Sequence, residues 1–205
     1  MKNFIEVGKT DEEQAEQIKK WIKENAPQIV IGVALGLSGL WGFDYYKEYQ
    51  QNQALQARDY YLSVANNPNN TDALQALKKD YADGTYAQQA ELLLAKQAIS
   101  ENKPQAALDY LLPLINSTDE FVAQNAKFRA THVYLEIKDA DKALSVLGKN
   151  TNEAFAALYN HVKGDVYFAQ NNIKAAKEHY ALALSQLEAD SKLKGIVQIK
   201  LNDLN

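Results

Sequence analysis

The residue types that could carry out catalysis or bind metal are few in this chain, and their spacing fits neither role. The 205-residue sequence contains no cysteine, which excludes disulfides, thiolate metal ligands and a cysteine nucleophile. Its histidines, His132, His161 and His179, form no metal-ligand pattern such as HExxH. We therefore expect them on helix surfaces or in a binding groove rather than at a reactive centre.

Two short motifs match catalytic patterns only in part. Ser191 and Lys194 form a Ser-x-x-Lys sequence, but the accompanying Ser-Asp-Asn and Lys-Thr-Gly motifs are absent, so Ser191 is expected to begin the C-terminal helix. Asp139 and Asp141 lie in an expected turn, where acidic side chains cap helices. The sequence predicts a protein that is not an enzyme, with no cofactor, no metal and no small-molecule substrate.

The charge pattern excludes nucleic acid as a ligand. The formal net charge is −4 at pH 7, and the lysines and arginines form no basic stripe. Binding to a phosphate backbone requires clustered cations. We therefore expect no nucleic acid among the partners.

The elements that position these residues are expected to be helices. Beyond the break at residues 66–70, apolar residues recur at helical spacing and no strand pattern alternates. A second break is expected at Asp83 and Gly84, and Ser117 with Glu120 forms a capping-box pattern. Helices are expected over residues 44–65, 72–82, 85–101, 104–116, 119–137, 140–149, 152–170, 173–188 and 191–204.

Small and aromatic residues in the C-terminal half follow the spacing of the tetratricopeptide consensus, a helix-turn-helix repeat of about 34 residues. The clearest copy consists of Gly164, Tyr167, Ala176, Tyr180 and Ala183. Earlier copies place Tyr134, Ala143 and Leu147, and more weakly Ala98, Ala107 and Leu111, at matching positions. We expect these residues to pack in the repeat core, and successive repeats to stack into an all-α solenoid.

Two parts of this solenoid need separate interpretation. Residues 47–82 are either a degenerate repeat or a linker helix, and the C-terminal helix is expected to cover the last repeat. The concave face, formed by the first helix of each repeat, is the expected binding surface. Candidates for that face are His132, Tyr134, Asn160 and His161.

Residues 25–43 contain no charged side chain, and no other run in the chain is comparable. About 20 helical residues cross a hydrocarbon core of about 30 Å. Pro27 to Tyr46 supplies this length, with Pro27 suited to the first turn and Trp41 to the headgroup level. A buried helix of a soluble protein is one alternative, and a cleaved signal peptide is another, although no small-x-small cleavage site follows. The sequence predicts an uncleaved membrane span over residues 26–46.

Flanking cations predict the orientation of this span. Those before it are Lys9, Lys19, Lys20 and Lys23, and those after it are Lys47 and Arg58. The bias places residues 1–25 in the cytosol as a tail and residues 47–205 across the membrane.

The tail and the span each carry a surface that could bind a partner. Thr10 and Glu13 form a capping-box pattern ahead of an amphipathic helix that either rests on the membrane or docks a partner protein. The apolar face of that helix consists of Ala15, Ile18, Trp21 and Ile22. Within the span, Gly32 and Gly36 form a GxxxG pattern, which is either a helix-helix contact face or ordinary glycine content.

The whole layout resembles the family of YfgM-like ancillary subunits of the bacterial SecYEG translocon. The resemblance rests on the tail helix at residues 13–25, the glycine-rich span at 31–42, the repeat segments at 129–135 and 140–144, and the closing helix at 198–204. It implies an inner-membrane protein with a single span and a periplasmic tetratricopeptide-like repeat domain. It also implies association with Sec translocon subunits and with a membrane-anchored periplasmic chaperone of the prolyl-isomerase type.

From this resemblance we expect a non-enzymatic inner-membrane scaffold that assists the handling of translocated proteins. The alternative is a membrane-bound regulator that couples the state of the envelope to a cytosolic signalling partner through residues 1–25. The resemblance transfers no residue-level site.

Overall fold

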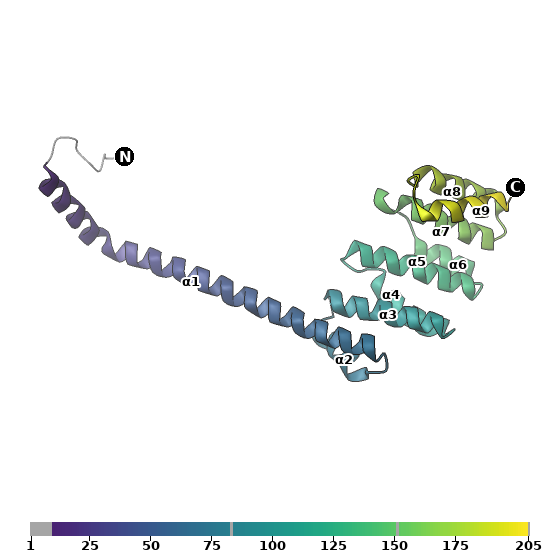
Figure 1. Ribbon diagram of the computed structural model, residues 1–205, viewed down its shortest axis with the longest axis horizontal. Coiled ribbons are helices and arrows are strands. Elements are labelled where there is room, and N and C mark those ends of the chain that lie inside the picture. Colours follow the sequence, from purple (N-terminus) through teal and green to yellow (C-terminus); the bar gives the residue numbers. More distant parts are fainter. Residues whose placement is uncertain (1–9, 83, 151, 205) are drawn as a thin grey trace. The chain divides into compact units, whose positions relative to one another are not determined.

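The computed structural model describes residues 10–82, 84–150 and 152–204, which form helices with no strand among them (Figure 1). The all-α prediction is confirmed. The helix expected over residues 44–65 forms the last part of α1, and the other helices listed from the sequence are found with ends shifted by a few residues. The helices are α1 (Asp11–Asn66), α2 (Thr71–Asp80), α3 (Thr85–Ser100), α4 (Pro104–Leu114), α5 (Glu120–Glu136), α6 (Ala140–Leu147), α7 (Ala156–Ala169), α8 (Ile173–Gln186) and α9 (Lys192–Asn202). A short 3₁₀ turn, η1 (Glu153–Phe155), precedes α7. Lys9 and Asp83, which the sequence analysis singled out, lie outside the described residues.

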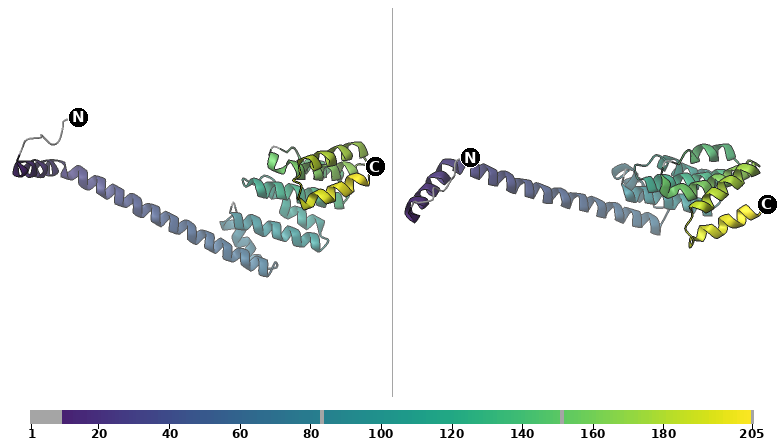
Figure 2. Two further views of the ribbon diagram at one scale, coloured as in Figure 1. Left: turned by 45° about the horizontal axis from the view of Figure 1, so that its top comes forward. Right: turned by 90° about the horizontal axis from the view of Figure 1, so that it is seen from above.

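The chain divides into two compact units, Met1–Gln56 and Ala57–Asn205, and α1 contributes to both. At the start of α1, the backbone N–H of Thr10 donates a hydrogen bond to the Glu13 carboxylate at 3.3 Å, which is one half of the expected capping box. The expected helix start at Pro27 is wrong, because Pro27 lies inside α1. Proline lacks the N–H that would bond to the preceding turn and bends a helix. Figure 2 shows such a bend in the N-terminal part of α1.

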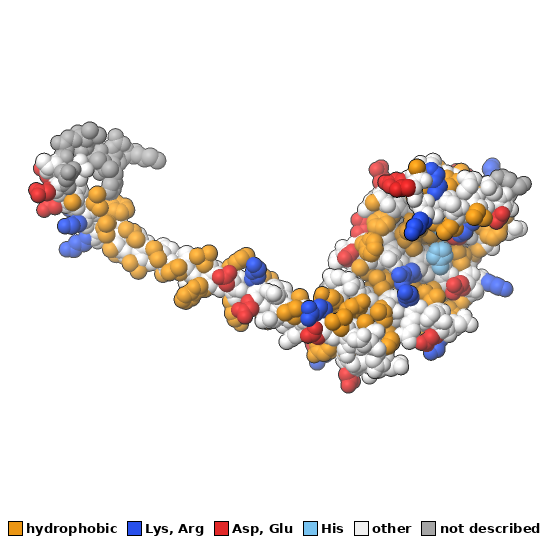
Figure 3. Space-filling model, in the orientation of Figure 1, with side chains coloured by type: hydrophobic (Ala, Val, Ile, Leu, Met, Phe, Trp, Pro, Cys, Tyr) orange, Lys and Arg blue, Asp and Glu red, His pale blue; other side chains and the backbone are white. Residues whose placement is uncertain are grey.

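The first unit exposes the large apolar side chains of α1. This helix is long and apolar enough to cross a membrane, with a mean hydropathy of 1.5 over its most apolar stretch and none of that stretch buried. Figure 3 shows hydrophobic side chains along α1 between two charged segments. Trp41 is 76% exposed, and a Cβ added at Gly32 or Gly36 would meet no atom within 4 Å. The helix therefore has a surface suited to lipid, with room for close contact at its glycines.

The second unit is a stack of helical pairs. The end of α1 joins this stack, because Ala57 and Val64 pack with Leu77 of α2 and Leu94 of α3 in one core cluster. The end of α1 and α2 thus pack in the same unit as the repeats. The pairs α3/α4, α5/α6 and α7/α8 follow in chain order, and α9 packs on α8 (Figures 1 and 2).

The turns inside three successive pairs share one backbone conformation. Asn102, Lys138 and Asn171 have φ of 58°, 62° and 58°, in the left-handed region. At each turn the N–H of the next residue donates to a carbonyl five residues before it at 2.8 Å, as in a Schellman motif. Asparagine tolerates this conformation, whereas lysine does not favour it. The repeated hydrogen bonds therefore hold Lys138 in a conformation that its residue type does not predict.

Short acidic and amide side chains begin several of these helices. Asp139 caps α6 by accepting the Lys142 N–H at 3.1 Å, and Ser191 occupies the N-cap position of α9, both as expected. The capping box expected at Ser117 is wrong. Asp119 caps α5, while the Ser117 hydroxyl oxygen accepts the N–H of Asp119 at 3.1 Å and shapes the preceding turn.

Candidate functional site

The last helical pair is held together by a glycine-tyrosine contact. Gly164 is buried in α7, and a Cβ at this position would lie 2.5 Å from ring atoms of Tyr180 on α8. Tyr180 is only 2% exposed. The absence of a side chain at Gly164 is therefore what lets the tyrosine ring lie against the backbone of α7.

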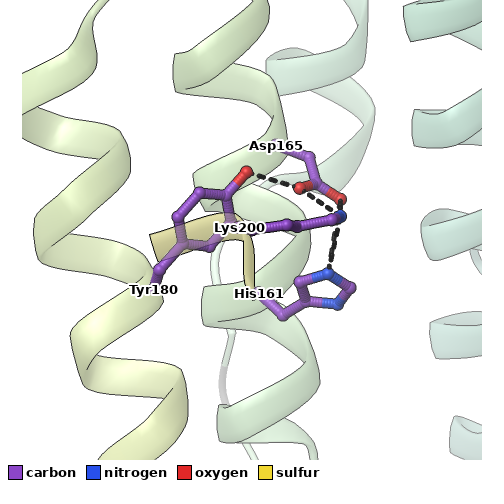
Figure 4. Close-up of polar contacts among 4 residues, drawn as sticks. All are labelled: His161, Asp165, Tyr180 and Lys200. Atoms are coloured by element: carbon purple, nitrogen blue, oxygen red, sulfur yellow. Dashed lines mark hydrogen bonds and ion pairs between the residues drawn. The ribbon is translucent and has the colours of Figure 1, made fainter. Parts of the chain in front are cut away.

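The tyrosine hydroxyl leads into a cluster of polar side chains from three helices (Figure 4). Tyr180 donates a hydrogen bond to the Asp165 carboxylate at 2.6 Å. The Lys200 ammonium, from α9, contacts both oxygens of that carboxylate at 2.6 and 2.8 Å. The same ammonium lies 2.9 Å from Nε2 of His161, one turn before Asp165 on α7. These contacts tie α9 to the preceding repeat.

Burial fixes the protonation states in this cluster. It lowers the pKa of His161 to about 4, so the ring is neutral at pH 7. Because Lys200 donates to Nε2, the ring proton must be on Nδ1, and this buried nitrogen has no hydrogen-bond partner among the described residues. Burial also raises the pKa of Tyr180, and its hydrogen bond to Asp165 acts in the same direction. The cluster therefore holds one ion pair and two neutral polar groups.

This arrangement suits a structural tie better than catalysis. The Asp165 carboxylate accepts from both Tyr180 and Lys200, so it is not free to take a proton from a substrate. No group of three or more metal-binding side chains occurs in the part of the chain that the structure describes.

A cavity of about 440 Å³ opens next to the ion pair. Asp165, Tyr180 and Lys200 border it on one side, and Leu135 of α5 borders it on another. Phe168 of α7, which is 53% exposed, also lines it. Its volume is within the range of sites that hold small molecules or peptide side chains. We treat this cavity and the ion pair together as the candidate site.

Comparison with known proteins agrees with this architecture. The family model described as tetratricopeptide repeat-like domain matches residues 19–205. The chain belongs to the tetratricopeptide repeat-like domain family. This membership confirms the solenoid that the repeat spacing predicts.

Three relatives that match almost the whole chain are each named ancillary SecYEG translocon subunit. The protein of this name from Escherichia coli is 26% identical over 98% of this chain and 100% of its own length. The relative from Haemophilus influenzae is 29% identical over 95% of this chain and 97% of its own length. The one from Neisseria gonorrhoeae is 25% identical over the same shares. No solved structure gives a significant match. The family resemblance stated from the sequence is thus confirmed.

The tetratricopeptide core positions predicted from the sequence lie in or beside the buried core. Those that are fully enclosed are Ala143, Leu147, Gly164, Ala176, Tyr180 and Ala183. Tyr134 and Tyr167 are half-buried and pack against core clusters. The ring of Tyr167 also stacks on the ring of His179, with 5.2 Å between the ring centroids. These side chains stabilise the repeats, and of them only Tyr180 also lines the cavity.

The residues predicted to line the groove of the tetratricopeptide solenoid differ in burial. His132 is exposed, Asn160 is half-buried, and His161 is buried within the ion-pair cluster. Asn160 accepts from Nδ1 of His179 at 2.9 Å and so serves the contact between α7 and α8. Asp165 and Lys200 were not predicted from the sequence. The one local signal was the spacing of His161 and Asp165, which places them one turn apart on the same face.

The buried His161 predicts a loss of stability in mild acid. Its pKa is lowered in the fold, so below its unfolded value of 6.5 the unfolded chain takes up a proton that the folded chain resists. The free energy of unfolding should fall as pH drops from 6.5 toward 4, by up to about 1.4 kcal/mol per pH unit from this group. Urea denaturation between pH 6.5 and 5 measures the slope. His161→Gln should flatten it, and an unchanged slope in that variant would contradict the assignment.

Proposed function

We propose that this protein is a non-enzymatic inner-membrane scaffold that associates with the Sec translocon. The observation that carries the proposal is full-length similarity to three relatives named ancillary SecYEG translocon subunit. The exposed apolar surface of α1 supports a membrane anchor, and the solenoid supports protein binding. The site described above holds no free catalytic group, which favours a binding role.

The proposed topology has three segments. Residues 1–25 form a cytoplasmic tail, residues 26–46 span the membrane, and residues 47–205 form the periplasmic repeat domain. Lys19, Lys20 and Lys23 on the N-terminal side support this orientation. A reporter fused after Asn205 should be active only outside the cytosol, and activity inside the cytosol would exclude this topology.

The proposed partners are translocon subunits and a membrane-anchored periplasmic chaperone of the prolyl-isomerase type, with which the scaffold would handle translocated proteins. The full chain, tagged at its C-terminus and purified in mild detergent, should recover both partners above the level of a tagged unrelated single-span protein. Enrichment of neither would refute the scaffold. Gly32 and Gly36 are the proposed contact in the membrane. Replacing both with leucine should reduce recovery of the translocon more than Gly42→Leu does.

A regulatory role for the tail is the second candidate. Ile18, Trp21 and Ile22 are 47%, 40% and 48% exposed and form one apolar face of α1. Such a face could dock a cytosolic signalling protein. Replacing the three with serine leaves the flanking lysines in place. If recovery of the translocon and chaperone persists while an envelope stress response changes, regulation through the tail is favoured over the scaffold alone.

A further inference from the structure

The cavity beside the ion pair is apolar over much of its lining. Its apolar side chains come from Leu135 of α5, from Phe168 and Ala169 of α7, and from Leu204, which follows the end of α9. Phe168 is 53% exposed near the end of α7, and the adjacent Ala169 is exposed as well. An aromatic ring left open to water at the edge of a concave site is an unfavourable exposure that a ligand can relieve. The cavity is therefore suited to bind a large apolar group.

Equivalent positions of two successive repeats line this cavity. Leu135 lies one residue after Tyr134, and Phe168 lies one residue after Tyr167, so the two occupy the same place in their repeats. Both line the cavity. The apolar lining is thus built by the solenoid and completed by the terminal helix.

Negative groups outnumber positive groups in the lining of the cavity. The Lys200 ammonium is paired with Asp165, which leaves it little capacity for an outside anion. The Asp203 carboxylate also lines the cavity, and among the described residues no side-chain hydrogen bond or ion pair to it occurs. One positive and two negative groups give the lining a formal charge of −1. A ligand that brings a cation beside its apolar group is therefore complementary, and an acidic ligand is not.

We propose that this cavity binds a segment of a partner polypeptide that carries a large apolar side chain next to lysine or arginine. The apolar side chain seats against Phe168 and Leu135, and the cation pairs with Asp203. The volume of about 440 Å³ accommodates such a group. This inference rests on the proposed scaffold function and names the class of segment that the repeat domain would hold.

Peptide binding to the full chain in detergent micelles tests the proposal. The probe is a fluorescein-labelled peptide, Gly-Ser-Lys-Leu-Phe-Lys-Ser-Gly, followed by fluorescence anisotropy. Replacing Leu-Phe in the peptide with Ser-Ser, or both lysines with glutamate, should weaken binding by about tenfold or more. An acidic peptide that binds as well as the basic one would overturn the proposal, as would a basic peptide that does not bind.

Protein variants locate the site. Phe168→Ser should weaken binding of the basic peptide by about tenfold, and Asp203→Lys should shift the preference toward the acidic peptide. Phe121→Ser is the matched control, because Phe121 is 65% exposed on α5 and does not line the cavity. Equal effects of Phe168→Ser and Phe121→Ser, or an unchanged charge preference in Asp203→Lys, would overturn the assignment. Circular dichroism checks that each variant is folded.

The peptide-binding cavity and the scaffold function can be refuted separately. If Phe168→Ser loses peptide binding while the full chain still recovers the translocon, both the cavity and the scaffold stand. If the peptide does not bind but the translocon is recovered, the cavity proposal fails and the scaffold stands. If the peptide binds and no translocon or chaperone is recovered, the scaffold function fails while the cavity stands as a peptide site.

Discussion

Replacing Gly164 with alanine is expected to lower the free energy of unfolding by about 2 kcal/mol. The added Cβ would lie 2.5 Å from the Tyr180 ring, a distance at which one of the two must move. The ring cannot yield easily, because it is buried and its hydroxyl is bonded to Asp165 at 2.6 Å. Overpacking of this kind costs about 1–3 kcal/mol, and the 2.5 Å separation places this site at the upper end of that range. The gain in helix propensity, about 1 kcal/mol, then leaves a net loss of about 2 kcal/mol.

Gly195 provides the matched control for this substitution. It also lies inside a helix, α9, but a Cβ there would meet no atom within 4 Å. Gly195→Ala should therefore raise the free energy of unfolding by up to about 1 kcal/mol, opposite in sign to Gly164→Ala. Urea denaturation followed by circular dichroism measures both. Two changes of the same sign would show that the Tyr180 contact does not govern the effect.

The features of this fold that depend on helix periodicity can be predicted from the sequence. Small residues such as Ala143 and Ala176 are fully buried where two helices cross, because only small side chains allow that approach. The pattern that identifies them is local, so it can be read without knowing which helices are neighbours. The breaks near residues 66–70 and at Asp139 follow from turn chemistry in the same way.

Two backbone features could not be predicted, for different reasons. Lys138 has φ of 62°, yet nothing in its residue type favours this region. The hydrogen bond from Asp139 N–H to the Tyr134 carbonyl at 2.8 Å supplies the constraint. Pro27 lies within α1, where the missing hydrogen bond is tolerated although proline favours the first turn of a helix.

The candidate site could not be predicted from the sequence, because its residues are far apart along the chain. Lys200 and Asp165 are separated by 35 positions along the chain, and their meeting depends on how α8 packs on α7 and α9 packs on α8. A lysine and an aspartate on separate helices carry no signal of their pairing. His161 could be placed on a repeat helix, but its contacts with Tyr180 of α8 and Lys200 of α9 depend on how distant helices pack.

Replacing Lys200 with methionine is expected to cost about 2 kcal/mol of the free energy of unfolding. The change removes the cation from Asp165, whose side chain is 11% exposed, and leaves Nε2 of His161 without its donor. Breaking a buried pair by removing one partner costs about 3–5 kcal/mol, and the smaller figure allows for solvent around Lys200, whose side chain is 35% exposed. Urea denaturation of the full chain in detergent measures the loss.

A double-mutant cycle separates the ion pair from the packing of the lysine stem. Asp165→Asn should cost less than Lys200→Met, about 1 kcal/mol, because the amide oxygen still accepts from Tyr180 and the freed lysine can turn toward water. The double variant should be more stable than the sum of the single losses predicts, by about 1 kcal/mol or more. Lys142→Met, which breaks an exposed ion pair of 2.7 Å with Asp139, should have little effect. If the single losses simply add, α9 is held by apolar packing around Val197, and the cavity does not depend on the ion pair beside it.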